Sequence, residues 1–296
     1  MRESQISKIC VKAYLESGLN QSEIKHLLSI AKIASEIGGQ ILMDNYGQLT
    51  KIENKGRIGD LVTNADLASE KEIISFLNKS TPEIQILAEE SGIRGSNKSL
   101  VWCIDPLDGT TNFAHGYPLF ATSIGLCFND MPLLGSVNVP FLNEIYYAAP
   151  GIGSFCNGRE IRVSETQKLI HSLLVTGFEY DRHTMLDNNY AEFCWLTHRT
   201  RGVRRGGAAA VDLAFIASGK LDGYWEKGLS KWDLAAGVPL VEIAGGLVKN
   251  YPEGKFNLSS GRILASTPGI EFELLNELRK VKPLEKQFYM SKKQDN

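Results

Sequence analysis

Apolar side chains recur every three or four residues from Gln21 to Tyr46, which predicts a long helix with one buried face. A second helix is predicted over Ala65–Leu77, with Asn64 as its N-cap. Short apolar runs predict strands at Ile84–Ala88 and Leu100–Ile104. The first part of the chain therefore combines long helices with short strands.

The pattern then changes to three β-rich runs separated by turn residues, which predicts an antiparallel meander over Ala121–Phe128, Leu133–Val139 and Glu144–Ala148. After this meander, strands and helices alternate. The predicted strands are Leu173–Thr176, Asp222–Trp225 and Ile263–Ser266, and the predicted helices are Met185–Thr197, Ala209–Ser218, Asp233–Ala244 and Ile270–Val281. The succession predicts a layered α+β fold.

The same pattern suggests a division of the chain into four segments. Residues 1–20 form an N-terminal extension and residues 285–296 a polar tail. Between them we expect a sheet-rich α+β subdomain over 21–165 and an α/β subdomain over 166–284.

Composition excludes several classes of protein. The 296 residues are 43% hydrophobic and carry a net charge of −2, a balance typical of a globular protein that binds neither nucleic acid nor membranes. We find neither a membrane-spanning run nor a secretion signal, which favours a cytoplasmic location. The cysteines are odd in number and lack CxxC spacing, so we expect buried free thiols at Cys10, Cys103, Cys127, Cys156 and Cys194.

The stretch that carries most chemical information is Val101–Phe113, in which an apolar strand runs into Asp105 and Asp108. Pro106 is expected to interrupt the strand because it lacks an N–H group. Two carboxylates at a strand end suit Mg²⁺, and the carbonyl of Leu107 can add a further oxygen ligand. Free amides at a helix start just beyond can hold phosphate, so the pattern favours phosphoryl transfer to water over an ordinary surface turn.

Three further acidic segments support that interpretation. Glu89 and Glu90 follow a short strand, Asp60 and Asp66 flank a loop-to-helix junction, and Asp233 precedes a helix rich in small residues. Each alone is typical of a cap or a solvated acid. Because the histidines form no metal motif and the sequence shows no catalytic triad, we expect a water nucleophile.

Trp102–Phe113 resembles the first signature of the inositol monophosphatase family, and Trp232–Gly246 resembles the second. Asp60–Asp66 and Ala88–Ser91 match the family's other acidic motifs in the same order, so the resemblance covers about residues 21–281. It implies a layered αβαβα sandwich of the inositol monophosphatase and fructose-1,6-bisphosphatase type. It also implies a Mg²⁺-dependent phosphomonoesterase that hydrolyses inositol monophosphate, is inhibited by lithium and forms a homodimer.

The resemblance also implies roles for individual residues around two to three Mg²⁺ ions. The first ion's ligands correspond to Glu89, Asp105 and the Leu107 carbonyl, and the second ion's to Asp105, Asp108 and Asp233. Asp66 corresponds to the acid near a third, weaker ion.

The remaining correspondences concern water and substrate. Thr110, together with Glu89, corresponds to the group that orients and deprotonates the attacking water, and the amides of Gly109 and Thr110 would hold phosphate. Asp108, Ala209 and Glu226 match positions that contact the hydroxyls of the substrate alcohol. Lys55 matches a basic residue of a mobile loop near the site.

The substrate alcohol stays open at this point, because Gly177–Arg182 departs from the substrate loop of animal family members and is closer to bacterial and plastid relatives. The alternatives are histidinol-phosphate phosphatase, fructose-1,6-bisphosphatase and phosphoadenosine-nucleotide phosphatase. A non-catalytic sugar-phosphate-binding protein would be expected to lack at least one of the metal-site acids, and all are present.

Overall fold

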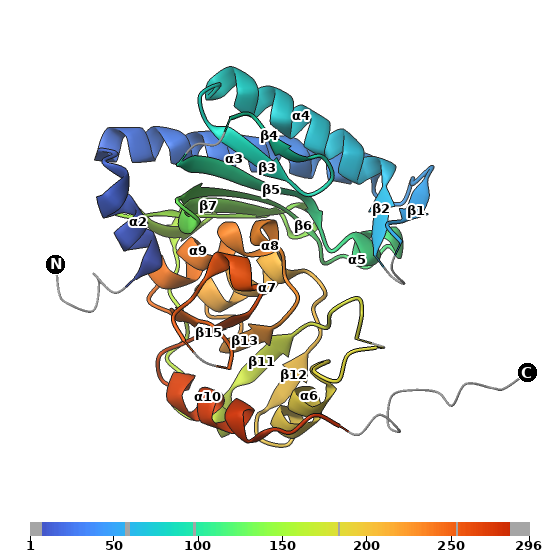
Figure 1. Ribbon diagram of the computed structural model, residues 1–296, viewed down its shortest axis with the longest axis vertical. Helices are drawn as coiled ribbons and strands as arrows, with labels where there is room; N and C mark the ends of the chain where they lie inside the picture. The colour runs from blue at the N-terminus through green and yellow to red at the C-terminus, as the bar shows by residue number, and fades with distance from the viewer. Residues whose placement is uncertain (1–7, 57–59, 97–98, 183, 253, 285–296) are drawn as a thin grey trace, which may run out of the picture.

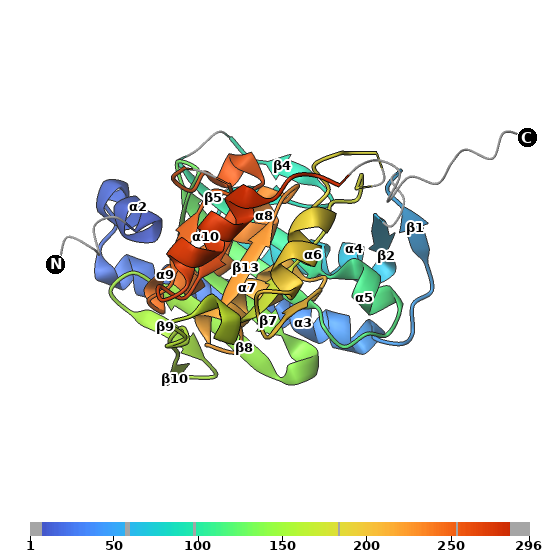
Figure 2. The same cartoon turned by 90° about the horizontal axis from the view of Figure 1, so that it is seen from below.

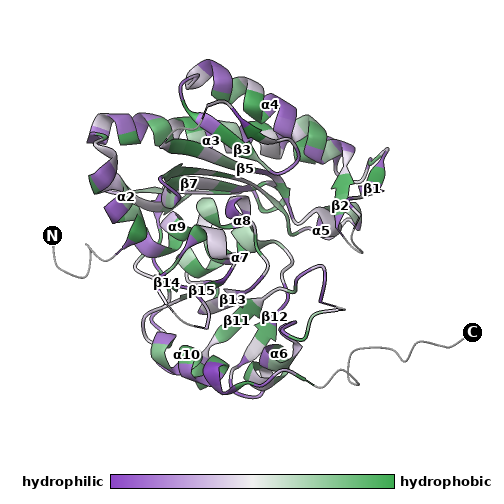
Figure 3. Ribbon diagram, in the orientation of Figure 1, coloured by the Kyte–Doolittle hydropathy of each residue, from purple (hydrophilic) through white to green (hydrophobic). Residues whose placement is uncertain are grey.

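The computed structural model describes residues 8–56, 60–96, 99–182, 184–252 and 254–284. In these residues the helices and sheets form five layers in the order helix, sheet, helix, sheet, helix (Figure 1). The predicted layered α+β fold is therefore confirmed. Figure 3 shows green, hydrophobic residues along the enclosed strands, whereas α4 mixes purple and green residues along its length.

The first layer consists of α3 (Gln21–Asn45) and α4 (Asn64–Ser80). A capping box of Asn20 and Glu23 begins α3, which ends within one residue of its predicted end. The expected N-cap of α4 is wrong. Thr63 caps this helix instead, because its hydroxyl accepts the amide hydrogen of Ala65 while Asp66 bonds back to the Thr63 amide.

The second layer is the large sheet, which in the described chain has the strand order β10-β9-β8-β7-β6-β5-β3-β4. β3 and β5 are parallel and every other neighbouring pair is antiparallel. The predicted meander is confirmed as β6, β7 and β8. The strands are β3 Gln85–Ala88, β4 Gly92–Arg94, β5 Leu100–Asp108, β6 Ala121–Phe128, β7 Met131–Val139, β8 Glu144–Ala149, β9 Gly153–Cys156 and β10 Arg159–Glu160.

Pro106 does not end β5, contrary to expectation. The strand continues to Asp108, and its register against β6 shifts between Asp105 and Asp108. Such an irregularity re-aims side chains and accommodates a proline within a sheet. The short helix α5 (Thr110–Ala114) follows directly after Gly109.

The middle layer consists of α7 (Ala209–Ala217), α8 (Lys231–Ala235) and α9 (Gly237–Ile243). The single helix expected over Asp233–Ala244 is therefore divided at Ala236. This junction rests on two glycines that face each other on β6 and β7, Gly125 and Gly135. A Cβ atom at either glycine would lie within 2.6 Å of the junction's backbone, so only glycine permits this contact.

The fourth layer is a second sheet with the described order β12-β11-β13-β15-β14, and α6 and α10 cover its outer face (Figure 2). Its strands are β11 Leu173–Thr176, β12 Gly202–Arg204, β13 Gly223–Glu226, β14 Leu247–Lys249 and β15 Ile263–Ser266, and the helices are α6 Tyr190–Thr197 and α10 Glu271–Lys280. The helix expected from Met185 begins only at Tyr190. Asn189 adopts a left-handed φ of 69° there, which a continuing helix cannot include.

At the N-terminus, α2 (Ile9–Ser17) packs against β7 and α9, although it belongs to the segment expected as an extension. Both carboxylate oxygens of Glu242 on α9 accept amide hydrogens from the start of α2, at Ile9 and Cys10. The predicted polar tail, 285–296, lies outside the described residues.

The smaller elements complete the described chain. A two-stranded sheet of β1 (Ile52–Asn54) and β2 (Leu61–Thr63) lies beside α4, and 3₁₀ helices cover Pro140–Leu142, Leu169–His171 and Leu258–Ser260. All five cysteines are free, but Cys156 is only partly buried and Cys194 is exposed, contrary to the expected burial. No helix in the described segments is long and apolar enough to cross a membrane.

Candidate active site

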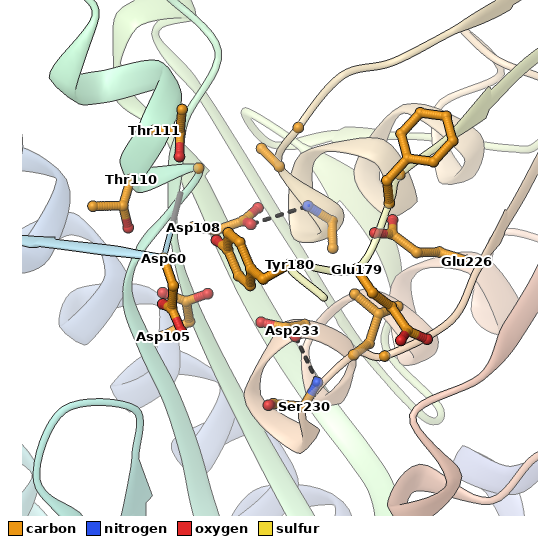
Figure 4. A pocket seen from close by; sticks show the side chains of 18 of the residues that line it. Asp60, Asp105, Asp108, Thr110, Thr111, Glu179, Tyr180, Glu226, Ser230 and Asp233 are labelled. Atoms are coloured by element: carbon orange, nitrogen blue, oxygen red, sulfur yellow. Dashed lines mark hydrogen bonds between the residues drawn. The ribbon is translucent and has the colours of Figure 1, made fainter. Parts of the chain in front are cut away.

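A cavity of about 370 Å³ lies where the ends of β5 and β13 meet the first turns of α7 and α8. Figure 4 shows acidic side chains reaching this cavity from both halves of the chain. Nearly all the predicted site residues line it: Glu89, Asp105, Leu107, Asp108, Gly109, Thr110, Ala209, Glu226 and Asp233, with Lys55 at its rim.

Gly109 connects β5 to α5 at the wall of this cavity. Its φ of 87° lies in the left-handed region, and an added Cβ would stand 3.0 Å from the Leu119 carbonyl oxygen. Glycine is therefore required for the tight turn that brings Asp105, Asp108 and the start of α5 together.

Asp108 joins the two halves of the molecule. One of its carboxylate oxygens accepts the amide hydrogen of Ala209 at 3.0 Å, and the other accepts that of Ala210 at 2.8 Å. A carboxylate at a helix N-terminus is favourable because the first amides have no partner within the helix. The contact spans about a hundred residues of sequence and holds α7 against the end of β5.

The other acids are held by local bonds. Asp233 accepts the Ser230 amide hydrogen at 2.6 Å in the capping box of α8. Asp105 accepts the Leu107 amide hydrogen at 3.0 Å. Glu89 follows β3 and receives the Lys55 ammonium at 2.7 Å.

Asp66 is the one predicted site residue that does not line the cavity. It is fully buried behind Thr110, whose hydroxyl lies 3.1 Å from Asp66 Oδ1 and 3.0 Å from the Leu107 carbonyl oxygen. Thr63 donates both its hydroxyl and its amide hydrogen to Asp66. Because the Thr110 hydroxyl carries a single hydrogen, Asp66 and the Leu107 carbonyl are alternative acceptors for it.

Burial of this acidic set disfavours its charge. Burial, followed by repulsion from Glu89, raises the pKa of both Asp105 and Asp233 well above the ordinary range. Burial likewise raises the pKa of Asp108 to about 7, although the amides of α7 lower it. Carboxylates crowded in this way are stabilised in their charged form by a cation.

The donor set fits Mg²⁺, which prefers oxygen ligands and keeps several of its waters. Among the residues that the structure describes, no group of three or more acidic, histidine or cysteine side chains is arranged so that it could hold a metal ion by itself, whereas Mg²⁺ is usually held by one or two carboxylates together with waters and substrate phosphates. A loose acidic cavity that also admits water and a phosphate ester is the arrangement expected for such a hydrated ion.

Glu226, the last residue of β13, lines the cavity and lies across it from Asp105 (Figure 4). Its carboxylate accepts the Tyr224 hydroxyl at 2.6 Å. Burial raises the pKa of Glu226 to about 7, with the neighbouring Arg205 acting in the opposite direction. When ionised, the Glu226 carboxylate offers hydrogen-bond acceptors that suit the hydroxyl groups of an alcohol.

Sequence reasoning overlooked several lining residues. Lys227 and Tyr180 carry no recognisable signal in the sequence, and Arg205 belongs to a short basic cluster with Arg201 and Arg204 that is equally typical of a solvated face. Tyr180 lies in the segment whose departure from the animal pattern was evident. Lys227 is only 4% exposed and is bonded to Glu192 at 3.0 Å, which no spacing rule anticipates.

Comparison with known proteins identifies the family to which the chain belongs. The sequence model of the inositol monophosphatase family matches residues 23–283. The chain belongs to the inositol monophosphatase family. An inositol-1-monophosphatase of Synechocystis sp. is 49% identical over 258 residues, which are 87% of this chain and 90% of that protein.

Solved structures agree with this membership. An inositol monophosphatase from Anabaena (Nostoc) sp. superposes with a TM-score of 0.82 at 46% identity, covering 88% of this chain and 98% of that one. In the sequence comparison, a fructose-1,6-bisphosphatase/inositol-1-monophosphatase of Aquifex aeolicus is 38% identical over 226 residues, which are 76% of this chain and 85% of that protein. As a member of this family, the protein is a hydrolase of phosphate monoesters with a generally metal-dependent activity.

Proposed function

We propose that this member of the inositol monophosphatase family hydrolyses inositol monophosphate to inositol and phosphate with Mg²⁺. The observation that carries the proposal is one cavity lined by Glu89, Asp105, Asp108 and Asp233 together with a further buried carboxylate, Glu226. Figure 4 shows Glu226 across the cavity from Asp105. The separation matches a substrate with an anionic phosphoryl group and a polyol.

Two to three Mg²⁺ ions would be held by the Leu107 carbonyl and by the carboxylates of Glu89, Asp105, Asp108 and Asp233. When bound, Mg²⁺ supplies positive charge that acidifies water and stabilises the leaving alkoxide. Thr110, with Asp66 behind it, and Glu89 would hold the attacking water and accept its proton. The amides of Gly109 and Thr110 would orient the phosphoryl oxygens, while Asp108, Ala209 and Glu226 would contact the ring hydroxyls.

Fructose-1,6-bisphosphate is the second candidate substrate, because Arg205 lines the cavity near Glu226 and could meet a second phosphate group. The proposal also includes inhibition by lithium, a homodimer, a cytoplasmic location and a boundary between two subdomains near residue 165. The free thiols support a reducing compartment. The change of sheet between β10 and β11 supports the boundary.

The decisive experiment measures phosphate release from inositol-1-phosphate, histidinol phosphate, fructose-1,6-bisphosphate and phosphoadenosine phosphate, with Mg²⁺ and after chelation. We expect Mg²⁺-dependent release, with inositol-1-phosphate preferred. Preference for another ester would overturn the assignment of inositol monophosphate as the substrate but would leave the proposed metal chemistry in place. Absence of metal-dependent release from every ester would favour a non-catalytic sugar-phosphate-binding protein instead. Size-exclusion chromatography with light scattering tests whether the protein is a homodimer.

A further inference from the structure

The segment between β11 and α6 forms one wall of the cavity. Gly177, Phe178, Glu179 and Tyr180 all line it. Figure 4 shows the Tyr180 ring lying among the acidic side chains, toward Asp60 and Asp105 and away from Glu226. Tyr180 therefore faces the end of the cavity at which the phosphoryl group would bind.

Internal bonds hold this wall in place at its base. Asn189 donates to the Thr176 hydroxyl and to the Gly177 carbonyl oxygen, each at 2.7 Å. The Asn189 side-chain oxygen accepts the indole hydrogen of Trp225 at 2.6 Å. The Phe178 ring also packs 5.1 Å from that of Tyr190, measured between centroids.

A second anchor is a cluster of charges around Asp187. Its carboxylate bonds to the Lys227 ammonium and, at 3.0 Å, to the Arg262 guanidinium. Lys227 also bonds to Glu192. Although Lys227 lines the cavity, its ammonium is bonded to these two carboxylates, and the bonds tie the end of β13 to Asp187 and to α6.

We propose that Tyr180 is a substrate-binding residue whose phenolic hydroxyl donates a hydrogen bond to the phosphoryl group of the bound ester. This inference rests on the proposed function. The acids at that end can only accept hydrogen bonds when ionised, whereas the phosphoryl oxygens need donors. A phenol that lines the same cavity as Gly109 and Thr110 supplies such a donor without adding charge.

The contact is with the phosphoryl group, which all monoester substrates share. Tyr180→Phe, which keeps the ring and removes the hydroxyl, should lower kcat/KM by about 10- to 100-fold, the range for one hydrogen bond to a charged group. The factor should be the same for inositol-1-phosphate and for p-nitrophenyl phosphate, which has no polyol. Glu226→Gln should instead impair inositol-1-phosphate selectively.

A binding measurement makes the test independent of turnover. Isothermal titration of wild type and Tyr180→Phe with inorganic phosphate in Mg²⁺ should show affinity weakened by a similar factor. The control is Tyr117→Phe, a tyrosine that is 54% exposed and belongs to the segment after α5. It should leave both rate and affinity unchanged.

Two outcomes would overturn the proposal. Unchanged phosphate affinity in a Tyr180→Phe protein with the wild-type melting temperature would remove the phosphoryl contact. A loss confined to inositol-1-phosphate would place Tyr180 at the polyol end instead. If the wild-type protein hydrolyses none of the esters, the proposed function fails, yet the phosphate titration still decides the role of Tyr180.

Discussion

Replacing Gly135 by alanine tests whether the sheet positions the catalytic acids. Its new Cβ would stand 2.4 Å from the Cα and 2.5 Å from the carbonyl oxygen of Ala236, where ordinary contacts begin at 3.4 Å. The two backbones must therefore separate by about 1 Å, because no flexible side chain can yield. Overpacking of this kind costs about 1–3 kcal/mol in free energy of unfolding.

The displacement should also reach the site. Ala236 lies three residues after Asp233, at the junction of α8 and α9. A shift of about 1 Å in a catalytic group can reduce a rate by about 100-fold, and the sheet will absorb part of the movement. We therefore expect Gly135→Ala to lower Mg²⁺-dependent phosphate release by about 10- to 100-fold.

The two effects are measured separately, by urea unfolding and by phosphate release at saturating Mg²⁺. Gly18→Ala is the matched control, since Gly18 has a φ of 72° but no atom within 4 Å of an added Cβ. It should cost about 1 kcal/mol from backbone strain alone and leave the rate unchanged. A Gly135→Ala protein with wild-type stability and rate would refute the reasoning.

Three further predictions concern buried carboxylates. Asp105→Asn should reduce phosphate release to background. The chain should stay folded by circular dichroism, because asparagine can still accept the Leu107 amide hydrogen. The control is the exposed variant Glu16→Gln, and turnover by a folded Asp105→Asn protein would reject the assignment of Asp105 as a metal ligand. Burial raises the pKa of Glu226 from 4.5 to about 7, so its ionisation should cost the native state up to about 3 kcal/mol as pH rises through this window. Glu226→Gln should therefore gain stability relative to wild type between pH 5 and pH 8 in urea titrations, and a pH-independent difference would contradict this. Glu242→Ala should cost about 1–3 kcal/mol by leaving the first amides of α2 without an acceptor, and it should spare activity; an unchanged urea midpoint would exclude this anchoring role.

Local patterns predicted most of the elements, and the errors share a cause. The strand over Leu173–Thr176 was predicted with its observed bounds, because its apolar run depends on neighbouring residues alone. The helix expected from Met185 fails because Asn189 takes a left-handed conformation fixed by bonds to Thr176 and Trp225. Those partners lie on β11 and β13, so the apolar pattern that starts at Met185 could not predict the bonds.

The sequence by itself determined the layered fold and the order of the acidic motifs, since periodicity and motif spacing are properties of neighbouring residues. Only the tertiary structure decided that Asp108 caps α7, that Asp66 stands behind Thr110, and that Tyr180 faces the acids. These arrangements join segments tens of residues apart. They depend on how the layers pack, and close packing is a property of the whole chain.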